Sequence, residues 1–328
     1  MSDMTFPKAI DALKHPPTSP QDSAQRLIAP SDAPQFAALG RQPFAFRHAL
    51  HSNPLFTLEA IRALAGRLPD HTEFKAWQNG RIKVEDGWAT REDAWLPFDE
   101  TLANIAETNS VVVLKHVEQD EVFGPVLQQL LGEVFAGAPE AFREDVVLGE
   151  CLVFVNSPGR LSPYHFDLEP SFLLQISGEK TVHALPGGDR TIVCQREMEN
   201  YCGGGDFSAG IYKPELQQME KVMTLNSGDG AYFPSTGPHW VQNGDTVSIS
   251  VNVNFDIRSM HHRLRHVHGF NHRMRRWGLA PAEPGTTPMM DDLKARIWAN
   301  AMRIKRLIRN RMNGPRPSDH YPVWSPPR

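Results

Sequence analysis

The chain has 328 residues, of which 40% are hydrophobic and 22% are charged, and its formal net charge is −4. This length and apolar content suffice for one large domain or two ordinary ones, and they exclude a chain that is disordered throughout. The near-neutral charge gives no reason to expect a protein that coats nucleic acid or membranes. Three cysteines cannot build a disulfide framework, and the sequence has no signal-peptide pattern and no long apolar run. We therefore expect a cytoplasmic protein without a membrane partner.

Charge is distributed unevenly along the chain. Residues 258–316 contain fourteen lysines and arginines and three acids, a local net charge of +11, so the rest of the chain is acidic. We expect an acidic body followed by a basic C-terminal region.

The N-terminal part divides into an arm and a mixed segment. Residues 1–40 are rich in proline, serine, alanine and glutamine, a composition that predicts a flexible arm. Residues 41–145 are expected to pack on the core: one helix is capped by Thr57, a second opens at Asp120, and a short buried strand spans 110–116.

From residue 146 to 257 the pattern changes to short β-rich runs separated by glycine, proline and aspartate. Such spacing predicts an antiparallel sandwich or barrel, so the fold class is mainly β with flanking helices. The predicted strands are 147–157, 171–177, 180–186, 190–195, 221–226, 230–235 and 246–255. Residues 196–220 are too long and too glycine-rich for a hairpin turn and form a candidate lid.

The basic C-terminal region, residues 258–328, is predicted to be helical. Its first part is rich in histidine as well as arginine, with His261, His262, His266, His268 and His272. A second metal site is one interpretation, but the interleaved arginines would repel a cation, so we favour a basic surface that could hold an acidic substrate. No nucleic-acid motif supports a nucleic-acid partner. A strong amphipathic helix over 289–312 follows.

Three residues form a candidate metal site. His165 and Asp167 make an H-x-D pair, and on a strand two such side chains would point the same way. The alternative is an edge-strand histidine beside a turn aspartate. His239, expected at the end of a later strand after a Gly-Asp-Gly turn, could join the pair in a closed β-sandwich. Two imidazoles and one carboxylate on one face of an ion leave open positions, as in non-haem Fe(II) oxygenases.

Further polar residues fit the same scheme. Lys180 begins an otherwise apolar and small strand, and an inward lysine needs an anion such as the C5 carboxylate of 2-oxoglutarate. The alternative is an ordinary solvated lysine. Ser162 could donate a second hydrogen bond to the same carboxylate, and Asn252 or Asn254 on the last strand could face the cavity.

The string SPYHFDLEPSFLLQISGEKTVHALP and the later G-D-G-x-Y-F-P-x-x-x-P-H-W block resemble the JmjC or cupin-like Fe(II)/2-oxoglutarate-dependent dioxygenases, in the branch of asparaginyl hydroxylases. The resemblance covers roughly residues 110–257. It implies a double-stranded β-helix (jelly-roll or cupin) core. Within that core it implies His165, Asp167 and His239 as iron ligands, with Lys180 binding the C5 carboxylate.

The same resemblance implies roles for two further residues, and the sequence also departs from the family. Ser162 stands where relatives carry a threonine or similar hydroxyl, and Asn254 matches an asparagine near the cofactor. The sequence departs from the family in two ways: the strands before His165 contain no tyrosine for the same carboxylate, and Ser171 replaces a polar side chain that relatives carry after the acid.

The predicted function is therefore a hydroxylase that uses Fe(II), 2-oxoglutarate and O₂, releases succinate and CO₂, and acts on a peptide or protein side chain. Hydroxylation of a small metabolite and N-methyl-lysine demethylation use the same chemistry. A non-catalytic cupin-like metal-binding or scaffold protein is the alternative from another class. The helix at 289–312 predicts a homodimer, unless its apolar stripe packs on the helices of the N-terminal half.

Overall fold

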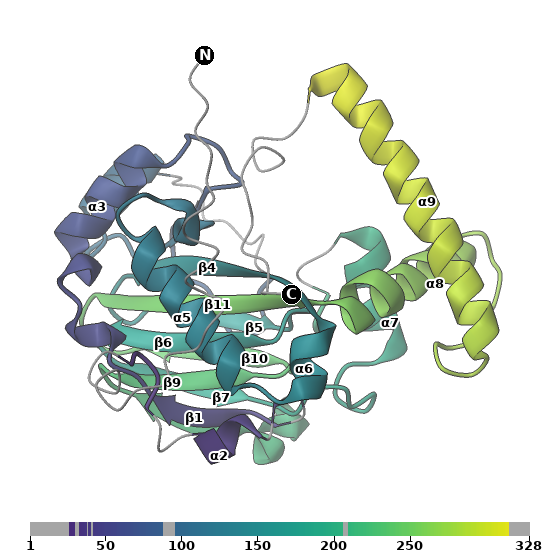
Figure 1. Ribbon diagram of the computed structural model, residues 1–328, viewed down its shortest axis with the longest axis horizontal. Helices are drawn as coiled ribbons and strands as arrows, with labels where there is room; N and C mark the ends of the chain where they lie inside the picture. Colours follow the sequence, from purple (N-terminus) through teal and green to yellow (C-terminus); the bar gives the residue numbers. More distant parts are fainter. Residues whose placement is uncertain are drawn as a thin grey trace.

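The computed structural model describes residues 26–29, 33–37, 39–40, 42–87, 96–205 and 209–314. Most of the predicted N-terminal arm and the last residues of the basic C-terminal region lie outside the described residues. The described chain forms two facing antiparallel sheets with helices on the outer side of one of them (Figure 1).

The seven-stranded sheet has the order β1-β9-β6-β11-β4-β3-β2 and the four-stranded sheet the order β5-β10-β7-β8. The first sheet contains β1 (Phe44–Arg47), β2 (Lys75–Gln78), β3 (Val111–Leu114), β4 (Val146–Asn156), β6 (Ser171–Ser177), β9 (Asp229–Phe233) and β11 (Ser248–Ile257). The second contains β5 (Leu161–His165), β7 (Lys180–Ala184), β8 (Lys221–Leu225) and β10 (His239–Asn243). From β4 to β11 the chain crosses repeatedly between the sheets, which gives a cupin-like sandwich and confirms the predicted fold class.

The helices surround this sandwich. Those before the core are α2 (Ala33–Phe36), α3 (Leu58–Arg67), α4 (Phe98–Ala103), α5 (Gly124–Gly137) and α6 (Glu140–Asp145), with the 3₁₀ turns η3 (Leu50–Ser52), η4 (Pro54–Phe56) and η5 (Val117–Gln119). Those within or after it are α7 (Gln195–Glu199), η6 (Asn200–Gly204), η7 (Pro214–Met219), η8 (Ser259–Leu264), α8 (Arg265–Arg276) and α9 (Pro288–Asn313). Thr57 caps α3 as predicted, since its hydroxyl accepts a hydrogen bond from the amide of Ala60.

Side-chain alternation sorts each strand of the larger sheet into two faces. In β11 the apolar residues from Ile249 to Phe255 pack against the helical layer, in one core with α5. The intervening residues of the same strand, which are serines and asparagines, face the second sheet, as the contact of Ser250 with Lys180 shows. The interior between the sheets is therefore partly polar, which is the arrangement that a binding site needs.

One feature of the predicted core was wrong. Residues 190–195 are not a strand: Thr191 is held in a turn by the Asp189 carboxylate, and Cys194 caps α7 in a capping box with Glu197. Local hydrogen bonds to the backbone thus outweigh the β-propensity of this run. The candidate lid, 196–220, contains α7, η6 and η7 in its described residues.

The C-terminal helices lie to one side of the sandwich (Figure 1). Helix α9 packs on α8 and η8 near its own start and extends away from the rest of the chain. The alternative that its apolar stripe packs on the N-terminal helices is wrong for the described residues, because that stripe is exposed. In the part of the chain that the structure describes, no helix combines the length and apolarity needed to cross a membrane.

Candidate metal centre

His165 and His239 face each other across two paired strands. His165 ends β5, and His239 begins β10 rather than ending a strand as predicted; the two residues are direct partners in the antiparallel register. Their ring centroids are 4.2 Å apart. Because directly paired residues project to the same face of a sheet, both imidazoles point into the same space.

Asp167 completes the group from outside the strand. The prediction that it shares a strand with His165 was wrong, since β5 ends at His165 and Asp167 lies in the following turn. That turn is fixed because the Asp167 carbonyl accepts a hydrogen bond of 2.7 Å from the amide of Thr236. Thr236 has a left-handed φ of 60° and its hydroxyl accepts a hydrogen bond from the amide of Gly188. A strained, doubly tied loop therefore positions the carboxylate.

The donor atoms of the three residues lie within 4.8 Å of one another. The Asp167 Oδ2 atom is 3.8 Å from His165 Nε2 and 4.0 Å from His239 Nε2. The Nδ1 atoms of the two rings lie 2.8 Å from the carbonyl of Pro163 and 3.2 Å from that of Gly237. A carbonyl can only accept, so each Nδ1 carries the proton and each Nε2 presents the lone pair that can bind a cation.

Burial affects the charge of this group. Desolvation raises the pKa of Asp167 and lowers the pKa of His239, so it disfavours the charged form of each. Phe233 stacks on the His239 ring, with centroids 4.1 Å apart, and contributes to that desolvation. A divalent cation would compensate the carboxylate and accept the two neutral imidazoles.

Lys180 lies deeper in the same interior. Its side chain is only 4% exposed, and its Nζ donates a 2.9 Å hydrogen bond to the Ser250 hydroxyl. The Phe154 ring lies beside the ammonium, 6.0 Å from Nζ to centroid. No carboxylate forms an ion pair with Lys180 among the described residues, and burial lowers its pKa to about 7. The alternative of a solvated lysine is therefore wrong.

Ser162 reaches the same interior because of an irregularity in β5. His239 pairs with His165. Val241 lies two residues after His239 but pairs with Ser162, which lies three residues before His165, so β5 contains one extra residue between these pairs. The bulge brings Ser162 to the face that His165 also occupies. Val241 also pairs with Val182 of β7, two residues after Lys180. Along the strand direction, Ser162 therefore lies between the level of the paired histidines and the level of Lys180.

Asn252 and Asn254 face the interior from β11. The Asn252 amide donates to the Ser171 hydroxyl at 3.4 Å. The Oδ1 atoms of both asparagines are buried without a hydrogen-bond partner, and so are both amide atoms of Asn156 on the neighbouring strand. A buried polar group without a partner is costly, so this wall of the interior is suited to a polar ligand or to ordered water.

Ser250, Phe154 and Asn156 were not among the predicted site residues. The strict alternation of serine and asparagine with valine and isoleucine in β11 was a usable signal for Ser250, since these positions share the face of Asn252 and Asn254. Nothing in the sequence pairs Phe154 with Lys180, because that proximity depends on how the two sheets face each other.

Comparisons with known proteins give distant structural likeness. No protein-family model and no curated protein matches the sequence. The chain resembles Escherichia coli YcfD, with 13% identity and a TM-score of 0.48 over 85% of this chain and 68% of that one. The same protein, described as a ribosomal oxygenase in complex with cobalt and 2-oxoglutarate, gives 14% identity and a TM-score of 0.46 over 84% and 67%.

A second likeness covers less of the chain. Oxalate decarboxylase from Lactobacillus farciminis, in a formate complex, gives 14% identity and a TM-score of 0.23 over 34% of this chain and 25% of that one. At these identities and TM-scores the solved structures say nothing about the activity of the present chain.

Proposed function

We propose that this chain is an Fe(II)- and 2-oxoglutarate-dependent oxygenase that hydroxylates a C–H bond of a peptide or protein side chain. One observation carries the proposal: the same interior contains a two-histidine, one-carboxylate group and a buried lysine without an anionic partner. A module that only bound a metal would have no use for the lysine, since an unpaired buried ammonium destabilises the fold.

The residues present fit both groups. Two imidazoles and one carboxylate from His165, Asp167 and His239 are a donor set suited to Fe(II), and they leave part of the coordination sphere open. Lys180 and the Ser250 hydroxyl would bind the C5 carboxylate of 2-oxoglutarate, and Ser162 would stand between this end and the metal. The unsatisfied amides of Asn252, Asn254 and Asn156 supply further polar contacts.

Bound together, Fe(II) and 2-oxoglutarate supply the oxidising chemistry, in which O₂ and 2-oxoglutarate yield succinate, CO₂ and a hydroxylated substrate. The chain's own residues orient these groups. The hydrogen bonds from Nδ1 to Pro163 and Gly237 hold the two rings, and the Thr236 amide holds the turn of Asp167. The aromatic ring of Phe233, which stacks on His239, excludes water beside that ligand.

Anaerobic spectroscopy tests the proposal without turnover. Addition of Fe(II) and then 2-oxoglutarate to the purified chain should give a weak visible charge-transfer band only after both are present. Aerobic addition should then release succinate, and mass spectrometry of candidate peptides should find products heavier by 16 Da. A chain that binds metal but gives neither the band nor succinate would instead be the non-catalytic cupin-like module.

A further inference from the structure

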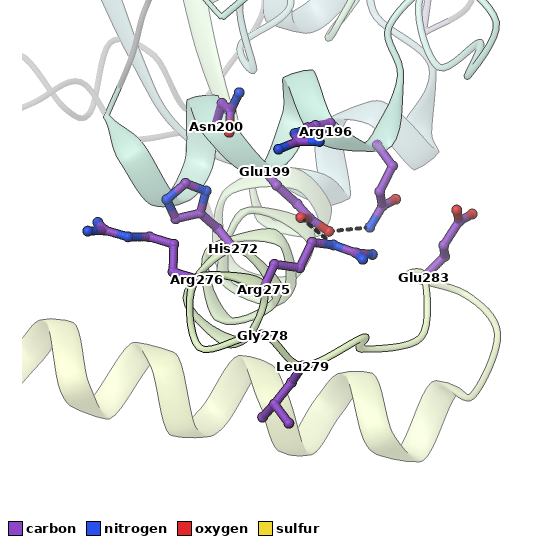
Figure 2. A pocket seen from close by; sticks show the side chains of 10 residues that line it. Arg196, Glu199, Asn200, His272, Arg275, Arg276, Gly278, Leu279 and Glu283 are labelled. Atoms are coloured by element: carbon purple, nitrogen blue, oxygen red, sulfur yellow. Dashed lines mark hydrogen bonds and ion pairs between the residues drawn. The ribbon is translucent and has the colours of Figure 1, made fainter.

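A cavity of about 590 Å³ lies outside the metal centre, where α7 and η6 meet α8 and the loop before α9 (Figure 2). It is lined by Arg196 from α7 and by Arg275 and Arg276 from the end of α8. These elements are far apart in sequence, and only the packing of α7 and η6 on α8 brings their arginines together. The proposed oxygenase function assigns no role to this cavity.

The negative charge within the cavity is largely compensated. Glu199 is buried, and its carboxylate accepts a 2.8 Å hydrogen bond from Arg275 and a 2.7 Å bond from Gln195 (Figure 2). Arg196 and Arg276 form no ion pair or side-chain hydrogen bond within the described residues. Arg196 on α7 and Arg276 on α8 therefore line the cavity without a counter-ion from the described residues, together with His272 and Asn200.

The helix dipole favours the position of only one of these two arginines. Arg276 lies in the last turn of α8, where a cation is favoured by the helix dipole. Arg196 is the second residue of α7, which continues into η6, so it lies near the positive end of that helix. A cation is disfavoured there, and a ligand with negative charge would compensate it.

We propose that this cavity binds acidic side chains of a polypeptide. Guanidinium groups match carboxylates in a bidentate geometry, and the exposed Leu279 at the same cavity can contact a neighbouring apolar side chain. Glu283 also lines the cavity, and its carboxylate has no partner within the described residues. A continuous phosphate backbone would meet repulsion at Glu283, whereas a peptide with one or two spaced acids would not.

The cavity adjoins the metal centre through a single helical segment. Asn200 lines the cavity, and the next residue, Tyr201, stacks on Phe166 with ring centroids 5.0 Å apart. Phe166 stands between His165 and Asp167 in the chain. If the chain is a peptide hydroxylase as proposed, this site anchors the substrate beside the helical segment that contacts the metal loop and raises its effective concentration there.

Fluorescence anisotropy of the metal-free, full-length chain tests the site directly. The probe is a fluorescein-labelled tetrapeptide with two glutamates separated by two glycines, and the same peptide with glutamine in place of glutamate is the uncharged reference. The R196E/R276E variant loses two solvent-exposed ion contacts and gains repulsion between its new glutamates and the peptide. We therefore expect its dissociation constant for the peptide to be about tenfold higher. The R303E/K305E variant, with the same charge change on the exposed face of α9, should bind within about twofold of the native chain.

A variant that binds the peptide more tightly distinguishes a specific site from an effect of unfolding. Removal of the unpaired carboxylate in E283Q should tighten peptide binding, which a damaged fold would not do. If R196E/R276E and R303E/K305E weakened peptide binding equally, the peptide would be held by general charge attraction and the proposal would be overturned. Displacement of the peptide by 10 mM inorganic phosphate, or tighter binding of an oligouridylate with the same arginine dependence, would also overturn it. Because no iron is present, these results are independent of the spectroscopic test of the proposed function.

Discussion

The residue with the clearest conflict between stability and function is Lys180. Its ammonium is buried beside Phe154 and has one hydroxyl partner, and this burial lowers the pKa of Lys180 to about 7, which shifts the balance toward the neutral amine. An anion bound beside it would reverse that shift. The lysine therefore destabilises the unliganded fold and prepares it for a carboxylate.

Lys180→Met is expected to stabilise the unliganded chain and to weaken 2-oxoglutarate binding. The folded pKa of about 7 lies below the ordinary value of 10.5, so the cost of burial is full below pH 7 and falls as the pH rises toward 10.5. The gain at pH 6 is at most about 5 kcal/mol, less about 1 kcal/mol for the lost bond to Ser250. Urea unfolding at pH 6 and pH 9 measures it, and a gain that did not shrink at pH 9 would contradict the prediction.

The same variant should raise the dissociation constant of 2-oxoglutarate about ten- to a hundredfold, since a charge-assisted hydrogen bond contributes about 1.5 to 3 kcal/mol. Metal binding should be nearly unchanged, which serves as the internal control. Calorimetry in the presence of Mn(II), without oxygen, would measure both.

Asp167→Ala tests the metal centre at the level of a single ligand. The carboxylate occupies a turn held by backbone hydrogen bonds, so its removal should leave the fold intact and weaken the metal. We expect a native melting temperature within a few degrees, loss of metal-induced stabilisation, and no succinate. Succinate release at the native rate would show that Asp167 is not a ligand.

Among the elements, η6 packs closely on α8. Gly203 lies against His272 of α8: a Cβ atom at this position would come within 2.5 Å of the His272 Cβ atom. The neighbouring Gly204 has more space, since its nearest contact would be 3.8 Å away. This contact sets how closely η6, which carries Tyr201, approaches both α8 and the metal loop.

Gly203→Ala should therefore lower the free energy of unfolding by about 1 to 3 kcal/mol through overpacking. Gly204→Ala is the matched control and should be neutral or slightly stabilising, because alanine is the better helix former. Chemical denaturation of both variants measures the difference. Similar losses in the two would mean that the approach of His272 does not limit this packing.

For the whole molecule, the unusual feature is the exposure of α9. Among its residues, Asp291, Lys294 and Ala295 are buried, all near its start. Leu293, Ile297, Ile304, Ile308 and Met312 form an apolar stripe and are each 47% exposed or more. The helix extends beyond the sandwich in Figure 1, so the stripe is accessible to a second copy of the chain.

We predict a homodimer through this stripe. The helix is also basic, so two copies repel each other, and added salt should strengthen the dimer by screening. Light scattering at micromolar concentration should give twice the chain mass. An I304E/I308E variant should be monomeric, and R303E, off the stripe, should remain dimeric. A monomeric mass for the native chain would rule the dimer out.

The sequence by itself determined six strands of the core, the order of the candidate ligands and the presence of an inward-facing lysine. Alternating apolar and polar residues define two faces of a strand, and this local property needs no knowledge of the partner strand. The residue types and spacing of His165, Asp167 and His239 indicated one donor set, and Lys180 was identifiable from its otherwise apolar strand.

Only the tertiary structure decided which strands, loops and helices pack against each other. The bulge in β5 turns Ser162 inward, the loop around Thr236 places Asp167 beyond the strand, and the facing of the sheets brings Ser250 to Lys180. The cavity with Arg196 and Arg276 likewise joins residues about eighty positions apart. Strand pairing, loop closure and helix packing are long-range, so no local pattern encodes these contacts.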